Sequence, residues 1–341
     1  MTSCKYGTNR VIEPKNVLPQ AASKINPSLP IYDNELLIEV DVLNIDSASF
    51  TQIKKACHGD EEQMKEMITS IIEEKGKMQN PVTGSGGMLI GTIIEKGKNH
   101  PDKDLKVGDK IATLVSLSLT PLLLESIHKI HLDKDQVEVT AKAILFESGI
   151  YAVLPTDLNQ TLALAALDVA GAPAQTNKLV KDGDDVLIIG AAGKSGLLCA
   201  YQARQNTKTG RVIGLVNEQA QVDLLKSLDL CDDIILADAT NAIDVYQQVQ
   251  EVLPNLADVV INVVNVENTE MASILSAKNT GTVYFFSMAT SFTKAALGAE
   301  GVGSDVTMLI GNGYTKDHAE FTLNILRTDQ RIRNLYEEKY I

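Results

Sequence analysis

The chain lacks the features that would direct it out of the cytoplasm or into a membrane. Its 341 residues contain no uncharged run of about 18 residues, the length that a membrane-spanning helix needs. No basic stretch followed by an apolar one opens the sequence, so we expect a cytoplasmic protein that is neither secreted nor membrane-bound. The four cysteines (Cys4, Cys57, Cys199 and Cys231) are scattered without metal-like spacing, which predicts free thiols in a reducing compartment.

Positive charge is also in short supply. Lys and Arg number 31 against 44 Asp and Glu, for a formal net charge of −13 at pH 7. This balance disfavours nucleic acid and anionic membrane surfaces as partners. It would attract a cationic small-molecule substrate, although a solvated acidic surface explains it equally. The length suffices for two domains, and we expect a homodimer or a higher homo-oligomer.

The first part of the chain carries patterns typical of β-strands. Apolar side chains at alternate positions of 35–43 predict a half-buried strand. Residues 88–95 and 111–119 predict two more strands, the last one after a turn at 107–110. A helix interrupts them at 60–75, where apolar residues recur three and four positions apart. We expect this stripe to pack in the core, with a lid or a partner contact as the alternative; it consists of Met64, Met67, Ile68, Ile71 and Ile72.

From residue 161 the pattern changes to strands that alternate with helices. Such alternation predicts a parallel sheet covered by helices on both faces, a doubly wound α/β domain. The expected strands are 186–189, 211–216, 233–236, 257–264 and 282–287, and the expected helices are 220–228, 242–252 and 270–277. An alanine- and leucine-rich segment, 162–172, precedes them. The tail predicts a further helix with Thr315 at its N-cap and Asp317 in its first turn.

A glycine-rich turn follows the first of these strands, where 190–196 reads Gly-Ala-Ala-Gly-Lys-Ser-Gly. In a dinucleotide site the first glycine permits the turn, the middle one lets the backbone approach phosphate, and the last allows close packing of the helix. Free N–H groups at the helix start attract the pyrophosphate. We therefore expect a Rossmann site that binds NAD through Gly190, Gly193, Lys194, Ser195 and Gly196. A P-loop is the rival interpretation, but Ile188 stands where its first glycine is required.

Polar residues after the later strands predict the rest of the cofactor site. Asn217 or Glu218 would meet the adenosine ribose, and the lack of an arginine directly after them favours NAD over NADP. Residues 238–240 would border the adenine. Asp238 and Asn265 can equally be turn residues, which their types favour. The candidates are Asn217, Asp238, Ala239, Thr240, Asn265 near the nicotinamide, and Ser287 near the nicotinamide or the substrate.

A β-rich first half followed by a Rossmann unit resembles the medium-chain dehydrogenase/reductase superfamily over nearly the whole chain. This resemblance implies a GroES-like β-barrel catalytic domain in 1–155 and a Rossmann NAD-binding domain in 156–300. It also implies a final strand and C-terminal helix in 301–341 that complete the fold. Longer runs resemble one family within it, the L-erythro-3,5-diaminohexanoate dehydrogenases; they are 4–8, 11–15, 44–53, 81–91, 170–176 and 284–298.

The family resemblance implies a reaction of lysine fermentation. An enzyme of this kind would oxidatively deaminate 3,5-diaminohexanoate to 5-amino-3-oxohexanoate with NAD and release ammonia. Two alternatives remain open. One is a zinc-independent, quinone-reductase-like reductase of carbonyls or enones that uses NADPH. The other is a dinucleotide-binding protein without catalysis, because one fold hosts unrelated functions.

The zinc ligands of the superfamily are missing from this chain. Zinc-dependent members carry a cysteine soon after an early strand, where this chain has Asn44 to Ser47, and a glycine–histidine–glutamate where it has Gly84-Ser85-Gly86. His128 and His131 are three positions apart, but no cysteine or acidic cluster accompanies them, which predicts exposed histidines. We therefore expect no metal.

Carboxylates would have to replace the metal in an amine dehydrogenase. They can hold an ammonium group, accept its proton and activate water. Three acids are candidates for the base: Asp46 after an early strand, Glu147 after an apolar run, and Asp168 among small apolar residues, a setting that would bury it. A helix cap or a solvated acid is the alternative for each. Lys294, after the strand 282–287, would meet the substrate carboxylate, unless it is an ordinary surface lysine.

Overall fold

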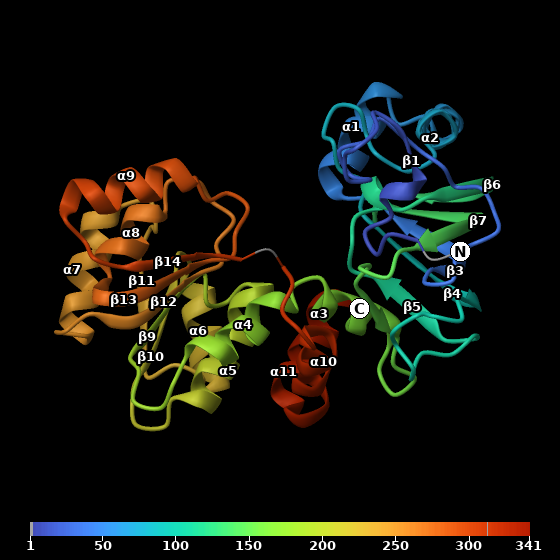
Figure 1. Ribbon diagram of the computed structural model, residues 1–341. Helices are drawn as coiled ribbons and strands as arrows, with labels where there is room; N and C mark the ends of the chain where they lie inside the picture. Colours follow the sequence, from blue (N-terminus) through green and yellow to red (C-terminus); the bar gives the residue numbers. More distant parts are fainter. Residues whose placement is uncertain (1–2, 312) are drawn as a thin grey trace. The chain divides into compact units, whose positions relative to one another are not determined.

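The computed structural model describes residues 3–311 and 313–341, and the chain divides into two compact units, residues 1–157 and 158–341. The first unit is built on a six-stranded antiparallel sheet with the order β6-β7-β3-β4-β5-β8 (Figure 1). Its sheet strands are β3 (Leu36–Asn44), β4 (Met88–Lys96), β5 (Lys110–Thr113), β6 (Leu122–His131), β7 (Gln136–Leu145) and β8 (Tyr151–Val153). A separate small sheet pairs β1 (Val11–Glu13) with β2 (Lys24–Ile25). The helical segments are η1 (Thr8–Arg10), α1 (Ser47–Ala56), α2 (Glu61–Lys75) and η2 (Leu117–Leu119).

The strands predicted at 35–43 and 88–95 are confirmed as β3 and β4. The strand predicted at 111–119 is wrong beyond Thr113, where β5 ends. Ser116 there accepts a hydrogen bond from the N–H of Ser118 and starts the short helix η2, so the chain leaves the sheet.

Helix α2 confirms the helix predicted at 60–75. Asp60 caps its first turn by accepting the N–H of Gln63 at 3.0 Å, and Gly76 ends it with a left-handed φ of 71°. The apolar stripe packs into the core of the first unit, with Met64 and Ile68 fully buried. Core packing is therefore the role of this stripe.

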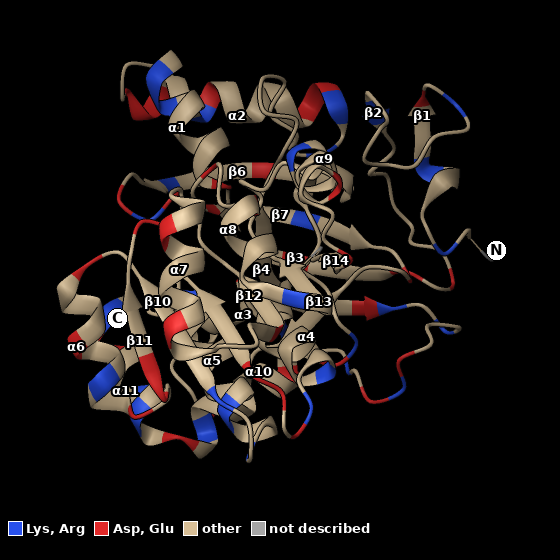
Figure 2. Ribbon diagram, turned by 90° about the vertical axis from the view of Figure 1, so that its left-hand side faces the viewer, with Lys and Arg blue, Asp and Glu red and all other residues tan. Residues whose placement is uncertain are grey.

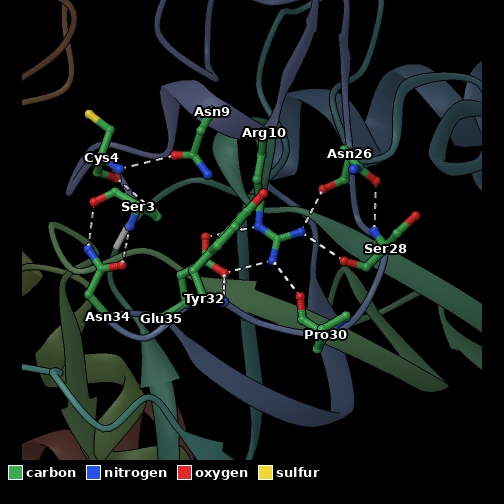
Figure 3. A network of polar contacts seen from close by, with 10 residues as sticks. All are labelled: Ser3, Cys4, Asn9, Arg10, Asn26, Ser28, Pro30, Tyr32, Asn34 and Glu35. Atoms are coloured by element: carbon green, nitrogen blue, oxygen red, sulfur yellow. Dashed lines mark hydrogen bonds and ion pairs between the residues drawn. The ribbon is translucent and has the colours of Figure 1, made fainter. Parts of the chain in front are cut away.

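The N-terminal segment is fastened to the first unit by a buried ion pair (Figure 3). The Arg10 guanidinium donates to both carboxylate oxygens of Glu35, at 2.9 and 2.7 Å, and the two side chains are 2% and 0% exposed. Its remaining N–H groups donate to the carbonyl oxygens of Asn26, Ser28 and Pro30. A planar guanidinium can serve five acceptors in this way, so one side chain ties 26–30 to the residue that precedes β3.

The second unit is built on a six-stranded, entirely parallel sheet with the order β11-β10-β9-β12-β13-β14. Its strands are β9 (Val186–Ile189), β10 (Val212–Val216), β11 (Asp233–Leu236), β12 (Ala257–Asn262), β13 (Ala277–Phe285) and β14 (Thr307–Ile310). Its helices are α3 (Gln160–Leu167), α4 (Gly171–Leu179), α5 (Lys194–Asn206), α6 (Gln219–Leu228), α7 (Ala242–Val252), α8 (Glu270–Leu275), α9 (Phe292–Val302), α10 (His318–Thr328) and α11 (Gln330–Tyr340).

Both faces of the parallel sheet are covered, as the alternating pattern predicts. Helices α7, α8 and α9 lie on one face, while α5 and α6 lie on the other (Figure 1). Strands β9 and β10 are buried along their whole length, and Figure 2 shows β10 without a charged residue. The predicted strands and helices of 186–287 are confirmed, with ends that differ by a few residues.

The tail of the chain differs from its prediction. Thr315 does not cap a helix, because α10 begins at His318 after Asp317, which has a left-handed φ of 64° and makes no side-chain cap. The Thr315 hydroxyl instead donates to the side chain of Gln175 at 3.3 Å. A second helix, α11, follows with Asp329 as its cap. Within 301–341, β14 is the last strand of the parallel sheet, and α10 and α11 pack on α3.

In the described part of the chain, no helix has the length and apolar character needed to cross a membrane. All four cysteines are free thiols, as predicted. Burial raises the pKa of Cys199 in α5 to about 12, so this thiol stays protonated at neutral pH.

Candidate active site

The glycine turn between β9 and α5 has the geometry that the sequence predicts. Gly190 has a φ of 88°, which only glycine adopts without strain, and its N–H donates to the carbonyl of Leu215 on β10. A Cβ at Gly196 would lie 2.1 Å from the Gly190 carbonyl oxygen, so the helix can approach the strand only because this residue is glycine. Gly193 stands at the N-cap of α5 and offers no side chain to cap the helix. The N–H groups of the first turn are therefore available to an anion.

A pocket opens beside this turn, at the carboxyl ends of the parallel strands. It is partly open to solvent and lies where β9 separates β10 from β12. In sheets of this kind the order of the strands reverses at this point, and ligands bind in the crevice that results. Its lining residues are Ile189, Gly190, Leu215, Val216, Asn217, Gln221, Ala237, Asp238, Ala239, Val264 and Val266.

The pocket brings together four of the predicted cofactor residues: Gly190, Asn217, Asp238 and Ala239. Thr240 lies behind Asp238 and donates to its Oδ1 from both its backbone N–H and its hydroxyl, at 2.9 and 2.8 Å. These hydrogen bonds lower the pKa of the Asp238 carboxyl. Oδ1 of Asp238 therefore stabilises a turn, which is the alternative role expected for this residue. Its other oxygen is available to a ligand.

The two residues predicted nearest the nicotinamide do not line this pocket. Asn265 is an exposed residue after β12, and the half-buried Ser287 follows β13, where its hydroxyl accepts the N–H of Ala289 at 3.1 Å. The two loops are linked by the buried Glu270, whose carboxylate accepts the N–H of Ser291 at 2.6 Å. Lys294 adds a second link, because its Nζ donates to Oδ1 of Asn268 at 2.5 Å.

A pair of glycine variants tests the packing at this turn. We expect Gly196→Ala to destabilise the second unit by roughly 1–3 kcal/mol, the usual cost of overpacking, because the new methyl group would strike a backbone carbonyl. Gly193→Ala is the matched control: its Cβ would lie 3.3 Å from the same oxygen, and its φ of −74° suits any residue. Thermal unfolding measures both variants. Equal melting temperatures would contradict the close packing at Gly196.

In the first unit, Asp46 lies two residues after the end of β3 and caps α1. Its Oδ1 accepts the N–H of Ser49 at 3.0 Å. Its Oδ2 is buried and has no hydrogen-bond partner among the residues that the structure describes. A buried carboxylate oxygen without a partner is costly, so this atom is a candidate for contact with a ligand.

The loop at 83–87 lies against the backbone of Asp46. A Cβ at Gly87 would lie 2.0 Å from the carbonyl oxygen of Asn44 and 2.7 Å from the amide nitrogen of Asp46. The exposed Thr83 has its hydroxyl 2.5 Å from that of Ser49, the residue that Asp46 caps. The two segments where zinc-dependent members of the superfamily carry ligands are thus adjacent here, and they present a carboxylate and hydroxyl groups instead. Across 3–311 and 313–341, no three His, Cys, Asp or Glu side chains gather as a metal site would require.

Glu147 and Asp46 lie at opposite ends of strand β3. Glu147 follows Leu145 of β7, which pairs with Leu36 at the start of β3, whereas Asp46 follows the end of β3. Nine residues of strand separate the two ends by roughly 26 Å at about 3.3 Å per residue. The Glu147 carboxylate accepts the Asn34 side-chain amide at 2.8 Å. These two acids cannot act on one substrate group.

Asp168 is not buried, contrary to the setting that its small apolar neighbours suggested. It ends α3 with its side chain 62% exposed, because the apolar side chains of α3 turn to the core and Asp168 turns away from it. Its Oδ2 pairs with Nζ of Lys194 at 2.9 Å, which joins a predicted catalytic residue to a predicted cofactor residue. Two tyrosines of α11 that sequence reasoning missed complete this cluster. The Tyr336 hydroxyl donates to the Lys194 carbonyl at 2.5 Å, and Lys194 Nζ lies 5.3 Å from the Tyr340 ring centroid.

Known proteins resemble this chain along its whole length. The family model for the L-erythro-3,5-diaminohexanoate dehydrogenase N-terminal domain matches residues 9–155. The L-erythro-3,5-diaminohexanoate dehydrogenase of Acetoanaerobium sticklandii is 61% identical, with 100% of each chain covered. The chain belongs to the L-erythro-3,5-diaminohexanoate dehydrogenase family. The enzyme of the same name from Fusobacterium nucleatum subsp. nucleatum is 58% identical over 99% of each chain.

Solved structures confirm the fold of this dehydrogenase family member. The quinone oxidoreductase from Coxiella burnetii is 20% identical, with a TM-score of 0.53 and coverage of 92% of this chain and 85% of that chain. A mycobacterial protein solved in complex with NADPH is 17% identical, with a TM-score of 0.52 and coverage of 92% and 84%. The chain thus has the medium-chain dehydrogenase/reductase architecture, a GroES-like domain and a Rossmann domain. Membership of this family makes the chain a dehydrogenase, an enzyme that acts on a small molecule.

Proposed function

We propose that this protein catalyses the NAD-dependent oxidative deamination of L-erythro-3,5-diaminohexanoate to 5-amino-3-oxohexanoate, with release of ammonia, in lysine fermentation. The observation that carries the proposal is the 61% identity, over both whole chains, to an enzyme named for this substrate. The unpartnered Oδ2 of Asp46 and the pocket at the glycine turn support the proposal, because such a reaction needs a proton acceptor and a cofactor site.

The proposed NAD site includes the pocket at the carboxyl ends of β9, β10, β11 and β12. Four of the residues that would hold the cofactor line this pocket: Gly190, Asn217, Asp238 and Ala239. The others would hold parts of the cofactor that extend beyond it; they are Gly193, Lys194, Ser195, Gly196, Thr240, Asn265 and Ser287. The open N-terminus of α5 suits a pyrophosphate. NAD rather than NADP is supported by Glu218, whose carboxylate directly follows Asn217 and would repel a 2′-phosphate.

Asp46 is the proposed base. A substrate ammonium cannot release its carbon-bound hydrogen as hydride until nitrogen loses a proton, and the free Oδ2 of Asp46 can accept that proton. A bound nicotinamide would supply the hydride acceptor for the carbon that bears this amine. Water then adds to the iminium carbon of the substrate, and loss of ammonia leaves the ketone. Asp46 is also suited to activate that water, because it is deprotonated again once its proton returns to solvent.

Lys294 is the proposed partner of the substrate carboxylate. Its described partner is the neutral side chain of Asn268, so its charge is not cancelled by that contact. Glu147 and Asp168 remain alternative bases, each with a polar partner already in place. We further propose a cytoplasmic homo-oligomer. Free thiols support the compartment, and exposed apolar side chains of the second unit, among them Met288 and Phe292, support a partner surface.

A turnover assay tests the proposed function. The purified protein is incubated with L-erythro-3,5-diaminohexanoate and either NAD or NADP, while reduced cofactor and ammonia are measured together. We expect NADH and ammonia in equal amounts, with a far lower rate from NADP. Consumption of NADPH by an enone, with no deamination, would favour the reductase instead, and cofactor binding without any turnover would indicate a protein that lacks catalysis.

A further inference from the structure

Lys194 stands where the glycine turn becomes helix α5, and three side chains from other helices hold it there. Asp168 at the end of α3 pairs with its Nζ, Tyr340 of α11 lies beneath that Nζ, and Tyr336 of α11 binds its backbone carbonyl. Asp168 is 26 residues from Lys194 in the sequence, and Tyr336 is 142 residues from it. Both nevertheless contact Lys194, the first residue of α5. Both the backbone and the side chain of Lys194 are thus held by residues of other helices.

The position of Lys194 bears directly on anion binding. It is the first residue of α5, and the Cα–Cβ bonds of a helix tilt toward its N-terminus, so its side chain starts out on the side of the free N–H groups. A cation at that end would add to the attraction of a pyrophosphate. The carboxylate of Asp168, if left alone there, would oppose it.

Tyr336 and Tyr340 of α11 hold Lys194 in position. Tyr336 is 0% exposed, and burial raises its pKa well above the ordinary value, so its hydroxyl remains a hydrogen-bond donor at any physiological pH. Its hydroxyl fixes the backbone of Lys194. The Tyr340 ring supplies a cation–π contact to the ammonium group. Helix α11 therefore stabilises the first residue of α5 through these two contacts.

We propose that Lys194 and Asp168 form a charge pair that tunes the affinity of the NAD site, with Asp168, Tyr336 and Tyr340 as positioning residues that act through Lys194. This inference rests on the proposed function, and it gives Asp168 a role in cofactor binding in place of proton transfer. The final helix of the chain thereby becomes part of the cofactor site without lining its pocket.

Direct measurement of NAD binding by calorimetry, together with steady-state kinetics, tests the proposal. We expect Lys194→Met to raise the Kd for NAD at least tenfold while kcat at saturating NAD stays within threefold, and Lys194→Arg to restore binding. Adding Asp168→Asn to Lys194→Met should recover at least threefold in affinity, because it removes an uncompensated negative charge beside the pyrophosphate. Tyr336→Phe should raise the Kd severalfold and leave kcat unchanged.

The matched control is Glu320→Gln, which removes the exposed carboxylate of another ion pair in the second unit, Glu320 with Arg327. Its Kd should equal that of the unaltered protein. NAD binding unchanged in Lys194→Met, or Asp168→Asn alone abolishing turnover at saturating NAD with the Kd intact, would overturn the proposal. If the unaltered protein bound no NAD at all, the proposed function itself would fail, which is a different result from either of these.

Discussion

Asp46→Asn is expected to lower kcat for deamination by roughly 10²–10⁴-fold, the usual contribution of a general base, while NAD binding stays unchanged. The reason is that an amide cannot take the proton that Oδ2 of Asp46 is free to accept. Folding should survive, since asparagine caps helices about as well as aspartate and its Oδ1 can still accept the N–H of Ser49. Steady-state kinetics at saturating NAD, with calorimetry for NAD, give both quantities.

Asp60→Asn is the matched control for this variant. Asp60 caps α2 with the same geometry, its Oδ1 accepting the N–H of Gln63 at 3.0 Å, but it has no assigned part in the reaction. We expect it to keep full activity. Near-normal turnover by Asp46→Asn would remove Asp46 as the base, and a comparable loss in the control would trace the effect to the helix caps instead.

Glu35→Ala is expected to destabilise the first unit by about 3–5 kcal/mol, the typical cost of leaving one member of a buried ion pair unpaired. Both side chains of the Arg10–Glu35 pair are at most 2% exposed, so water cannot replace the lost carboxylate. Scanning calorimetry should show the first unit melting roughly 6–20 °C lower, at about 2–4 °C for each kcal/mol.

Glu62→Gln serves as the comparison, since it removes the carboxylate of an ion pair with Lys65 whose Glu62 side chain is 79% exposed. Exposed pairs contribute about 0–1 kcal/mol, so its melting temperature should barely move. If Glu35→Ala melted like Glu62→Gln, the buried pair would not be what fastens the N-terminal segment.

The local patterns of the sequence predicted most of the fold. Period-two alternation located β3, helical spacing located α2, and buried apolar runs located β9 and β10, because each element buries one face or stripe of its own residues. The end of the chain was harder. Thr315 has the right chemistry for a cap, but Gln175, 140 residues earlier, takes its hydroxyl, and local sequence carries no sign of that contact.

Some residues of the candidate site could be grouped from the sequence, and others could not. Residues at the carboxyl ends of β9, β10 and β11 could be grouped from sequence, because parallel strands bring those ends to one edge of the sheet. In an antiparallel sheet, the carboxyl ends of neighbouring strands lie at opposite edges. Asp46 and Glu147 both follow strands, but the register of β3 and β7 places them at opposite ends of β3. Tyr336 and Tyr340 could not be found at all, since only the packing of α11 brings them to Lys194.

A structure of the protein with NADH and L-erythro-3,5-diaminohexanoate bound is the most direct test of the account. We predict that the nitrogen on C3 of the substrate lies about 2.6–3.2 Å from Oδ2 of Asp46, within reach for proton transfer. A substrate nitrogen held by Glu147 or Asp168, with Asp46 out of reach, would contradict it.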